Sequence, residues 1–209
     1  MTHVMYPRSV RATLLAATVA VTATWALSAN APAAAAPQAI PPLAEAAVAM
    51  APAQRLRLVP PENFPMATSP RCEILNNFGD GRSGGRVHTG VDIMATKGQE
   101  VYAMVDGTLT VQVVDGSGQS GASLSGNLWQ LTATTGGTYY VYAHLSAFAP
   151  GLAKGSKVLK GQLIGYVGDT GNSGPGNFHL HFEVHPGGGN AVDPLPLLSP
   201  VPSACRVVG

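Results

Sequence analysis

The chain has 209 residues, a length that fits one domain with appended segments. Its 12 lysine and arginine residues nearly balance 11 acidic residues, and the basic residues are scattered along the chain without forming runs. This distribution lacks the basic patch that nucleic-acid binding requires, so we expect no nucleic-acid partner.

The N-terminus has the pattern of a secretory signal peptide. Arg8 and Arg11 precede an uncharged stretch rich in Ala and Thr, and small-residue cleavage patterns follow at Ala26–Ser28 and Ala33–Ala35. An uncleaved membrane anchor is the alternative, because the uncharged stretch is just long enough to span a bilayer. Its weak hydrophobicity favours cleavage. We therefore expect residues 1–36 to be a signal peptide and the protein to be secreted to the cell envelope or cell wall.

Residues 37–71 are predicted to be a linker or pro-segment. The stretch is rich in Ala and Pro, and the pairs Pro41-Pro42 and Pro60-Pro61 interrupt any regular helix. A flexible segment would connect the signal peptide to a folded domain at residues 72–209.

The folded region is predicted to be all-β. Short runs of β-branched and aromatic residues are separated by glycine-containing turns and not by helical periodicity. The expected strands are Glu100–Val105, Thr108–Val114, Leu128–Thr134, Thr138–Tyr142, Leu163–Val167 and Phe178–Val184. Closely spaced strands of this kind indicate a small, largely antiparallel β-sheet domain. The Gly/Ser-rich stretch Ser117–Ser125 is expected to be a mobile loop and a candidate groove wall.

The chain contains two cysteines, Cys72 and Cys205. Export would place them in an oxidising compartment, where we expect them to form a disulfide that ties the two ends of the folded region together. Two reduced thiols are the alternative.

The run Phe178–Val184 alternates apolar and polar residues, as in a half-buried strand. Side chains two positions apart share one face of a strand, so His179 and His181 lie side by side. Such a pair can bind one metal ion, or bind a metal with one ring and a reacting water with the other. Two hydrogen-bonded histidines on a polar sheet face are the alternative. His185, which precedes a proline and a glycine run, is expected in a surface loop.

Three further groups have the chemistry of a catalytic zinc site. Asp92 follows His88 by four residues, and His144 ends a strongly β-type run. Catalytic zinc takes three protein ligands and keeps a fourth position for water, and His88, Asp92 and one histidine of the pair could supply them. The two remaining imidazoles could accept a proton from that water and stabilise an oxyanion. Alternatively, Asp92 stabilises a turn and His144 bonds inside a sheet. A closed structural zinc site is a further alternative, although such sites prefer cysteine.

These motifs resemble the lysostaphin/LytM-type zinc endopeptidases, which cut bacterial peptidoglycan cross-links. The likeness covers about residues 74–194. It is carried by His88-Thr89-Gly90-Val91-Asp92, Tyr142-Ala143-His144-Leu145-Ser146 and His179-Leu180-His181-Phe182-Glu183, with Phe78-Gly79, Arg82, Gly98, Asp106-Gly107 and Gly168–Gly174. The family fold is a small antiparallel β domain with a groove over the zinc.

Carried over to this chain, the resemblance implies that His88, Asp92 and His181 bind zinc and that His144 and His179 are the catalytic imidazoles. It implies a zinc endopeptidase with peptidoglycan peptides as substrate, and we expect a monomer. The insertion at residues 117–125 departs from the family pattern beside the groove and leaves the substrate preference open.

Two other functions fit parts of the sequence. A non-catalytic cell-wall-binding regulator of other hydrolases would share the fold, but relatives of that kind typically have incomplete ligand sets. A biotinyl- or lipoyl-type carrier is suggested by residues 155–165, but no lysine lies in an attachment motif at a hairpin tip. A hypothesis of latency also arises, in which the segment before Cys72 covers the groove and a side chain such as Asn63 binds the metal.

Overall fold

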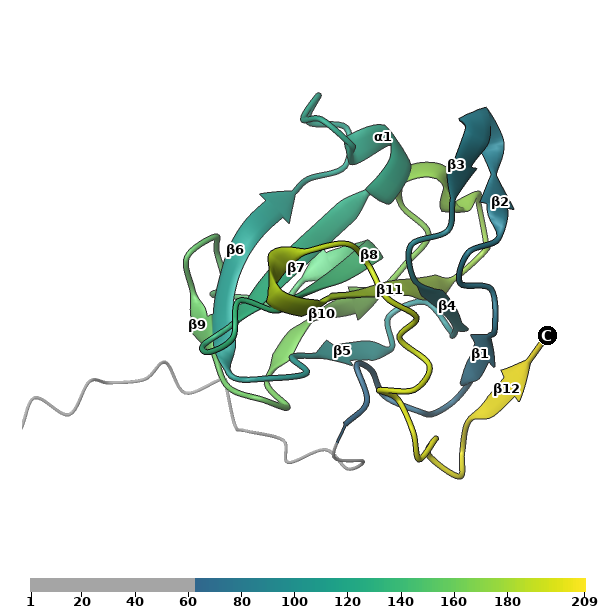
Figure 1. Ribbon diagram of the computed structural model, residues 1–209. Helices are drawn as coiled ribbons and strands as arrows, with labels where there is room; N and C mark the ends of the chain where they lie inside the picture. Colours follow the sequence, from purple (N-terminus) through teal and green to yellow (C-terminus); the bar gives the residue numbers. More distant parts are fainter. Residues whose placement is uncertain (1–62) are drawn as a thin grey trace, which may run out of the picture. The chain divides into compact units, whose positions relative to one another are not determined.

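The computed structural model describes residues 63–209, so the expected signal peptide and most of the expected linker lie outside the described residues. Within this range the chain forms one ten-stranded sheet, a separate two-stranded hairpin and very little helix (Figure 1). The strands are β1 (Glu73–Leu75), β2 (Gly81–Arg82), β3 (Arg86–Val87), β4 (Val91–Met94), β5 (Glu100–Tyr102), β6 (Gly107–Val113), β7 (Asn127–Ala133), β8 (Tyr139–Phe148), β9 (Lys157–Val158), β10 (Leu163–Val167), β11 (His179–His185) and β12 (Arg206–Val208). The short helices are η1 (Ser83–Gly85), α1 (Ala122–Ser125), η2 (Gly171–Ser173) and η3 (Pro186–Gly188). None of them is long and apolar enough to cross a membrane.

The strand order of the large sheet is β12-β1-β4-β11-β8-β7-β6-β9, and β10 pairs with both β8 and β5. Every neighbouring pair is antiparallel except β1 and β12. The prediction of an all-β, largely antiparallel domain is therefore confirmed. This order places β11 between β4 and β8, so three segments distant in sequence lie side by side.

All six expected strands are present: Leu163–Val167 has the expected ends, and the ends of the other five differ by up to six residues. The run expected at Thr138–Tyr142 extends to Phe148, so that His144 lies within β8 and does not end it. The strands that the sequence did not reveal are only two to four residues long, too short to show alternation.

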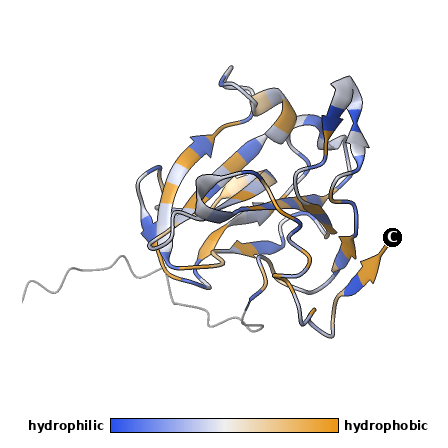
Figure 2. Ribbon diagram, in the orientation of Figure 1, coloured by the Kyte–Doolittle hydropathy of each residue, from blue (hydrophilic) through white to orange (hydrophobic). Residues whose placement is uncertain are grey.

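One face of the sheet packs against the apolar core. Buried and partly exposed residues alternate along much of β6, and Figure 2 shows the matching change between hydrophobic and hydrophilic residues along this strand. On β11, Leu180 and Phe182 are fully buried. The buried Trp129 donates its indole N–H to the carbonyl oxygen of Ile164 at 2.9 Å, which satisfies its one polar atom. The other face of β11 and its neighbours is left to carry polar side chains.

Residues 64–67, expected in the linker, pack against the domain. Phe64 and Met66 are 6% and 1% exposed and belong to the core. The side-chain amide of Gln99 donates to the carbonyl oxygen of Ala67 at 2.9 Å. The folded domain therefore begins before Cys72, because burial of two large apolar side chains in the core stabilises the folded state.

Cys72 and Cys205 form a disulfide, as expected. They directly precede β1 and β12, which pair in parallel at one edge of the sheet. The covalent bond thus holds the C-terminal strand against the strand that pairs with β4.

Replacing both cysteines by serine is expected to lower the free energy of unfolding by about 2–5 kcal/mol, because the bond closes a long loop and restricts the unfolded chain. Its sequence separation is 133 residues. Urea denaturation of the two proteins, each with and without reductant, measures the difference. Reductant should destabilise the parent protein and leave the double variant unchanged. Equal stabilities of the oxidised parent and the variant would contradict this role of the disulfide.

Candidate metal centre and active site

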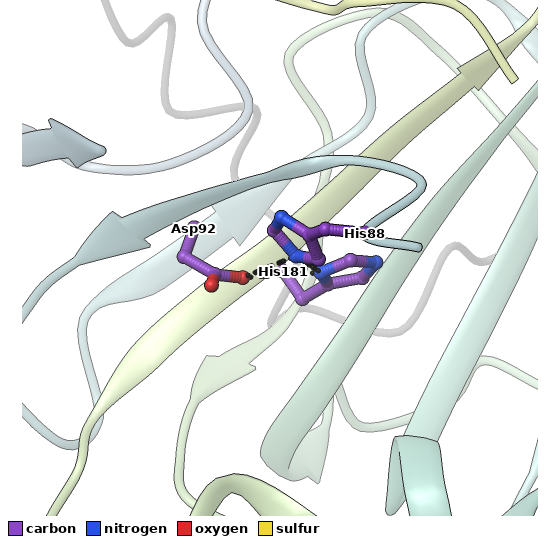
Figure 3. A group of neighbouring side chains, drawn as sticks. All are labelled: His88, Asp92 and His181. Atoms are coloured by element: carbon purple, nitrogen blue, oxygen red, sulfur yellow. Dashed lines mark hydrogen bonds and ion pairs between the residues drawn. The ribbon is translucent and has the colours of Figure 1, made fainter. Parts of the chain in front are cut away.

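Three side chains from β4, β11 and the loop before β4 point toward one another (Figure 3). His181 on β11 is paired in register with Asp92 on β4, and His88 lies four residues before Asp92. His88 Nε2 lies 2.8 Å from His181 Nδ1, and Asp92 Oδ1 lies 3.1 Å from each of these nitrogen atoms. The three residues that the resemblance named as ligands are thus brought together.

The spacing of these donor atoms fits a tetrahedral zinc site. Zinc bonds of about 2.0–2.2 Å place neighbouring ligand atoms roughly 3.3–3.5 Å apart. The observed separations of 2.8 and 3.1 Å are shorter, so the ligand atoms need to move apart by about 0.2–0.7 Å. His88 and Asp92 are buried and His181 is partly buried.

Hydrogen bonds on the far side of each ring orient both histidines as ligands. His88 donates its Nδ1–H to the carbonyl oxygen of Asn77 at 2.9 Å, and His181 donates its Nε2–H to Glu183 Oε1 at 2.9 Å. A carbonyl and an ionised carboxylate can only accept, so these contacts fix the protonated nitrogen of each ring. The other nitrogen is turned toward Asp92 and can hold either a proton, which bonds to the carboxylate, or a metal ion on its lone pair, the arrangement that supports metal-ligating histidines.

Asp92 is held in the same way. Its Oδ2 accepts hydrogen bonds from Asn77 Nδ2 at 2.8 Å and Arg82 Nη2 at 2.9 Å, which leaves Oδ1 for the cluster. Burial alone would raise the pKa of Asp92, but hydrogen bonds with His181 and His88 outweigh it and hold the pKa far below its usual range. Burial would lower the pKa of His181, yet its bonds to Asp92 and Glu183 raise it to about 9. The cluster therefore favours a bound cation, whether proton or metal.

Glu183 and His185 extend this network, and the sequence did not single out Glu183. Glu183 accepts from His181, from the Thr89 hydroxyl group and, at 2.8 Å, from His185 Nε2. Burial would raise the pKa of Glu183, but the hydrogen bond and charge of His181, together with the hydrogen bonds from Thr89 and His185, outweigh it and the pKa falls to about 2. His185 ends β11 and stacks on Tyr139 with ring centroids 4.1 Å apart, so its assignment to a surface loop is wrong. Residues two and four positions after His181 lie on the same face of the strand, so this alternation would have identified both residues.

His144 reaches the same face because β8 carries a bulge. Asn127 pairs with Leu145 and Trp129 with Tyr142, so two steps along β7 match three along β8. His144 has φ of 61° and is the one non-glycine residue with positive φ in the range 63–209. Regular alternation would turn its side chain into the core beside Tyr142. The extra residue turns it toward the groove and returns Leu145 to the core, so an uncommon backbone conformation is held at a candidate catalytic side chain.

His144 and His179 lie beside the metal cluster, with ring centroids 4.7 Å apart. Each donates its Nδ1–H to a carbonyl oxygen at 2.8 Å, that of Thr170 for His144 and that of Asn177 for His179. The free lone pair is then on Nε2, which for His179 lies 3.6 Å from Asp92 Oδ1. Burial lowers the pKa of both rings, and the nearby His179 contributes to lowering that of His144 to about 4. Both rings are therefore neutral proton acceptors at pH 7.

The five groups form the floor of a groove of ≈ 330 Å³. Its walls come from the β2–β3 hairpin, β8, α1 and η2, with Arg82, Arg86, Val87, Leu124, Ser125, Ala143, Asn172 and Ser173 among the lining residues. The expected Gly/Ser loop thus forms a groove wall through α1. It is fixed to η2 by close backbone approach, since a Cβ on Gly171 would lie 2.3 Å from the nitrogen of Gly126.

Asn63 is absent from this groove. Its side-chain oxygen accepts a hydrogen bond from Lys160 Nζ at 2.6 Å, and both residues border a separate hollow. The burial of Phe64 and Met66 fixes Asn63 there. The structure therefore contradicts the hypothesis that Asn63 supplies a metal ligand.

Sequence comparisons place these residues among known peptidases. The family described as Peptidase family M23 matches residues 86–194. The chain is 39% identical over 118 residues to DD-carboxypeptidase/endopeptidase Mpg of Neisseria meningitidis serogroup B, covering 56% of this chain and 24% of that protein. It is 31% identical over 146 residues to L-Ala–D-Glu endopeptidase of Bacillus subtilis, covering 65% of this chain and 42% of the relative. The chain thus spans less than half the length of these curated relatives.

Solved structures show the same fold. One described as the structural characterization of LytU has a TM-score of 0.51 and 28% identity, covering 63% of this chain and 87% of that chain. A zinc containing peptidase from Vibrio cholerae has a TM-score of 0.50 and 26% identity, covering 62% of this chain and 37% of that chain. The matched family region contains all five residues of the groove floor and more than half of the sequence. The chain belongs to peptidase family M23.

Proposed function

We propose that the protein is a zinc-dependent endopeptidase that hydrolyses peptide cross-links of bacterial peptidoglycan. The observation that carries this proposal is the convergence of His88 Nε2, Asp92 Oδ1 and His181 Nδ1 beside two neutral imidazoles at the floor of a groove. The names of both curated relatives describe endopeptidases, and one name specifies a bond between L-Ala and D-Glu. D-Glu is a constituent of peptidoglycan peptides, which supports this substrate class.

His88, Asp92 and His181 would bind zinc through the three donor atoms that already face one another. The likeness to a zinc containing peptidase supports the identity of the metal. Zinc, when bound, polarises a scissile carbonyl group and lowers the pKa of water to about 7. Asn77 and Glu183 keep the ligand rings in the required tautomers by hydrogen bonds to the nitrogen atoms that face away from the site.

His144 and His179 supply proton transfer and charge stabilisation. Each ring keeps its Nδ1–H on a backbone carbonyl and presents an unprotonated Nε2, so either ring can accept a proton from the attacking water. A ring that has accepted a proton keeps its Nδ1 hydrogen bond and gains an Nε2–H donor. That donor can stabilise the negative charge that develops on the carbonyl oxygen or protonate the leaving amine. The two rings share these tasks.

The groove suits an extended peptide. It is open to solvent, and β8, α1 and η2 contribute small or uncharged side chains such as Ala143, Ser125 and Asn172. A non-catalytic regulator of other wall hydrolases is the alternative. A protein that only binds would not require a carboxylate and four histidines with fixed tautomers to converge at one point. The arrangement therefore favours an enzymatic function.

We further propose that the protein acts outside the cytoplasm, as a monomer. The signal-peptide pattern of residues 1–36 motivates export. The Cys72–Cys205 disulfide supports it, because such bonds persist in oxidising compartments.

The zinc-loaded protein is expected to release soluble fragments from isolated peptidoglycan sacculi, because the groove floor combines a metal site with two proton acceptors. Mass spectrometry of the fragments identifies the bond. A chelator should stop release, and added zinc should restore it. A protein with one zinc per chain that releases nothing would contradict the proposed function.

His181→Ala is expected to abolish zinc binding and hydrolysis together, because it removes one of three ligands. Substitution of a residue that only hydrogen-bonds to a metal ligand lowers metal affinity roughly 10- to 100-fold, and the loss of zinc affinity here should be larger. Zinc content by mass spectrometry and the rate of fragment release measure the two effects. The exposed Lys157→Gln on β9 is the control and should retain both. Retention of zinc by His181→Ala would exclude this ligand set.

His144→Asn is expected to keep the zinc and lose turnover by about 10²- to 10⁴-fold, the usual contribution of a proton-transfer group. Asparagine is chosen because it tolerates the positive φ at this position. Zinc content and single-turnover rates separate the two properties. A normal rate would remove His144 from the reaction, whereas loss of zinc would make it part of the metal site.

Glu183→Gln is expected to weaken zinc binding about 10- to 100-fold, because an uncharged amide replaces the carboxylate that orients His181. Competition with a chromophoric chelator measures the affinity. Unchanged affinity would show that the carboxylate is not needed to orient the ligand.

A further inference from the structure

Arg82 and Arg86 face each other across the β2–β3 hairpin, which forms one wall of the groove. They are register partners in this two-stranded sheet, and both line the groove. Figure 2 shows blue, hydrophilic segments on both strands of the hairpin, separated by pale ones. Side chains directly opposite in an antiparallel pair share a face, and like charges in such a pair are destabilising. The hairpin therefore concentrates positive charge at the groove at a cost in stability.

The two guanidinium groups differ in their partners. Arg82 donates to Asp92 Oδ2 at 2.9 Å, so its charge is paired with the carboxylate of the metal site. Arg86 is exposed, and toward the described part of the chain it donates only its Nε–H, to the carbonyl oxygen of Ser83 at 3.2 Å. Among residues 63–209 it forms no ion pair. Most of its planar donor fork is therefore available at the groove.

The other charged side chains of the groove are already paired. Asp92 contacts the histidines and Arg82, and Glu183 contacts His181 and His185. The lining residues from α1 and η2 are uncharged. Among the described residues that line the groove, Arg86 is thus the permanently charged side chain that forms no ion pair.

We propose that Arg86, with Arg82 beside it, forms a subsite for a carboxylate of the substrate, so that the enzyme selects peptides with a free carboxylate near the scissile bond over their amidated forms. The inference rests on the proposed endopeptidase function and names the substrate class within it. A guanidinium group binds a carboxylate through two parallel N–H···O bonds, and this geometry explains arginine better than lysine here. A bound carboxylate would also reduce the repulsion between the two arginines.

The carboxylate can come from two places in a wall peptide, the α-carboxylate of a γ-linked D-Glu within the chain or the terminal carboxylate of D-Ala. A fluorescent stem tetrapeptide of L-Ala, γ-D-Glu, a diamino acid and D-Ala is therefore prepared in three forms. One form has both carboxylates free, one has the D-Glu carboxylate amidated, and one has the terminal carboxylate amidated. The form that binds more weakly identifies the source.

Dissociation constants are measured by fluorescence anisotropy on the zinc-loaded His144→Asn protein, in which cleavage should be suppressed. Amidation of one carboxylate is expected to weaken binding about 10- to 100-fold, the range for a charge-assisted hydrogen-bonded pair. Adding Arg86→Gln should abolish the difference between free and amidated peptides, and Arg86→Lys should retain part of it. Adding Lys157→Gln, which removes one exposed positive charge on β9, should retain all of it.

Three results would overturn the subsite: equal binding of all three peptides, preference that survives Arg86→Gln, or no binding of any peptide. Zinc content of the Arg86→Gln protein shows that its metal site is intact. Cleavage of the same peptides and of sacculi by the protein with His144 present is measured in parallel. Failure of cleavage there counts against the endopeptidase function, whereas the dissociation constants decide the carboxylate subsite separately.

Discussion

The pairing of His181 with Asp92 across β11 and β4 is the constraint on which the whole site depends. A slip of one residue in this register would turn His181 into the core and bring Phe182 to the groove. The apolar face of the same two strands prevents this slip, because Leu180 is paired with Ile93 and Phe182 with Val91, and these four side chains are fully buried. Each such side chain contributes about 1.5–3 kcal/mol by burial. The apolar core therefore sets the geometry of the polar cluster on the other side of the sheet.

The polar side of the sheet is a continuous hydrogen-bonded network and not a set of isolated ligands. Asn77 contacts both His88 and Asp92, and Glu183 joins His181 to His185. Within residues 63–209 no buried side-chain nitrogen or oxygen atom lacks a partner. Satisfied networks of this kind are rigid, so the ligand atoms are held in position before a metal binds. The free-energy cost of ordering the ligand side chains is therefore offset when the sheet folds, before a metal ion binds.

Much of the site could be predicted because its signals are local. The alternation around His179 and His181 and the four-residue spacing of His88 and Asp92 are visible within a few residues, and the resemblance assigned their roles. The partner of His181 could not be derived from pattern alone, because β4 has only four residues and register depends on the whole sheet. The bulge that turns His144 to the groove also has no local signal, since its cause is the pairing of β8 with β7.

The boundary of the folded part shows the same limit. The Pro- and Ala-rich composition before Cys72 predicts a linker, but Phe64 and Met66 pack into the core and hold Asn63 outside the groove. Composition averages over many residues, whereas two buried side chains decide where packing begins. Arg86 is a further example, because its pairing with Arg82 becomes visible only once the hairpin is formed.

The most direct test of the metal centre is anomalous diffraction at the zinc absorption edge from a crystal of the zinc-loaded protein. The geometry predicts one strong peak at about 2.0–2.2 Å from His88 Nε2, Asp92 Oδ1 and His181 Nδ1, with His144 and His179 outside bonding distance. A peak bonded to a different set of side chains, or no peak in this groove from a protein that contains zinc, would contradict the account.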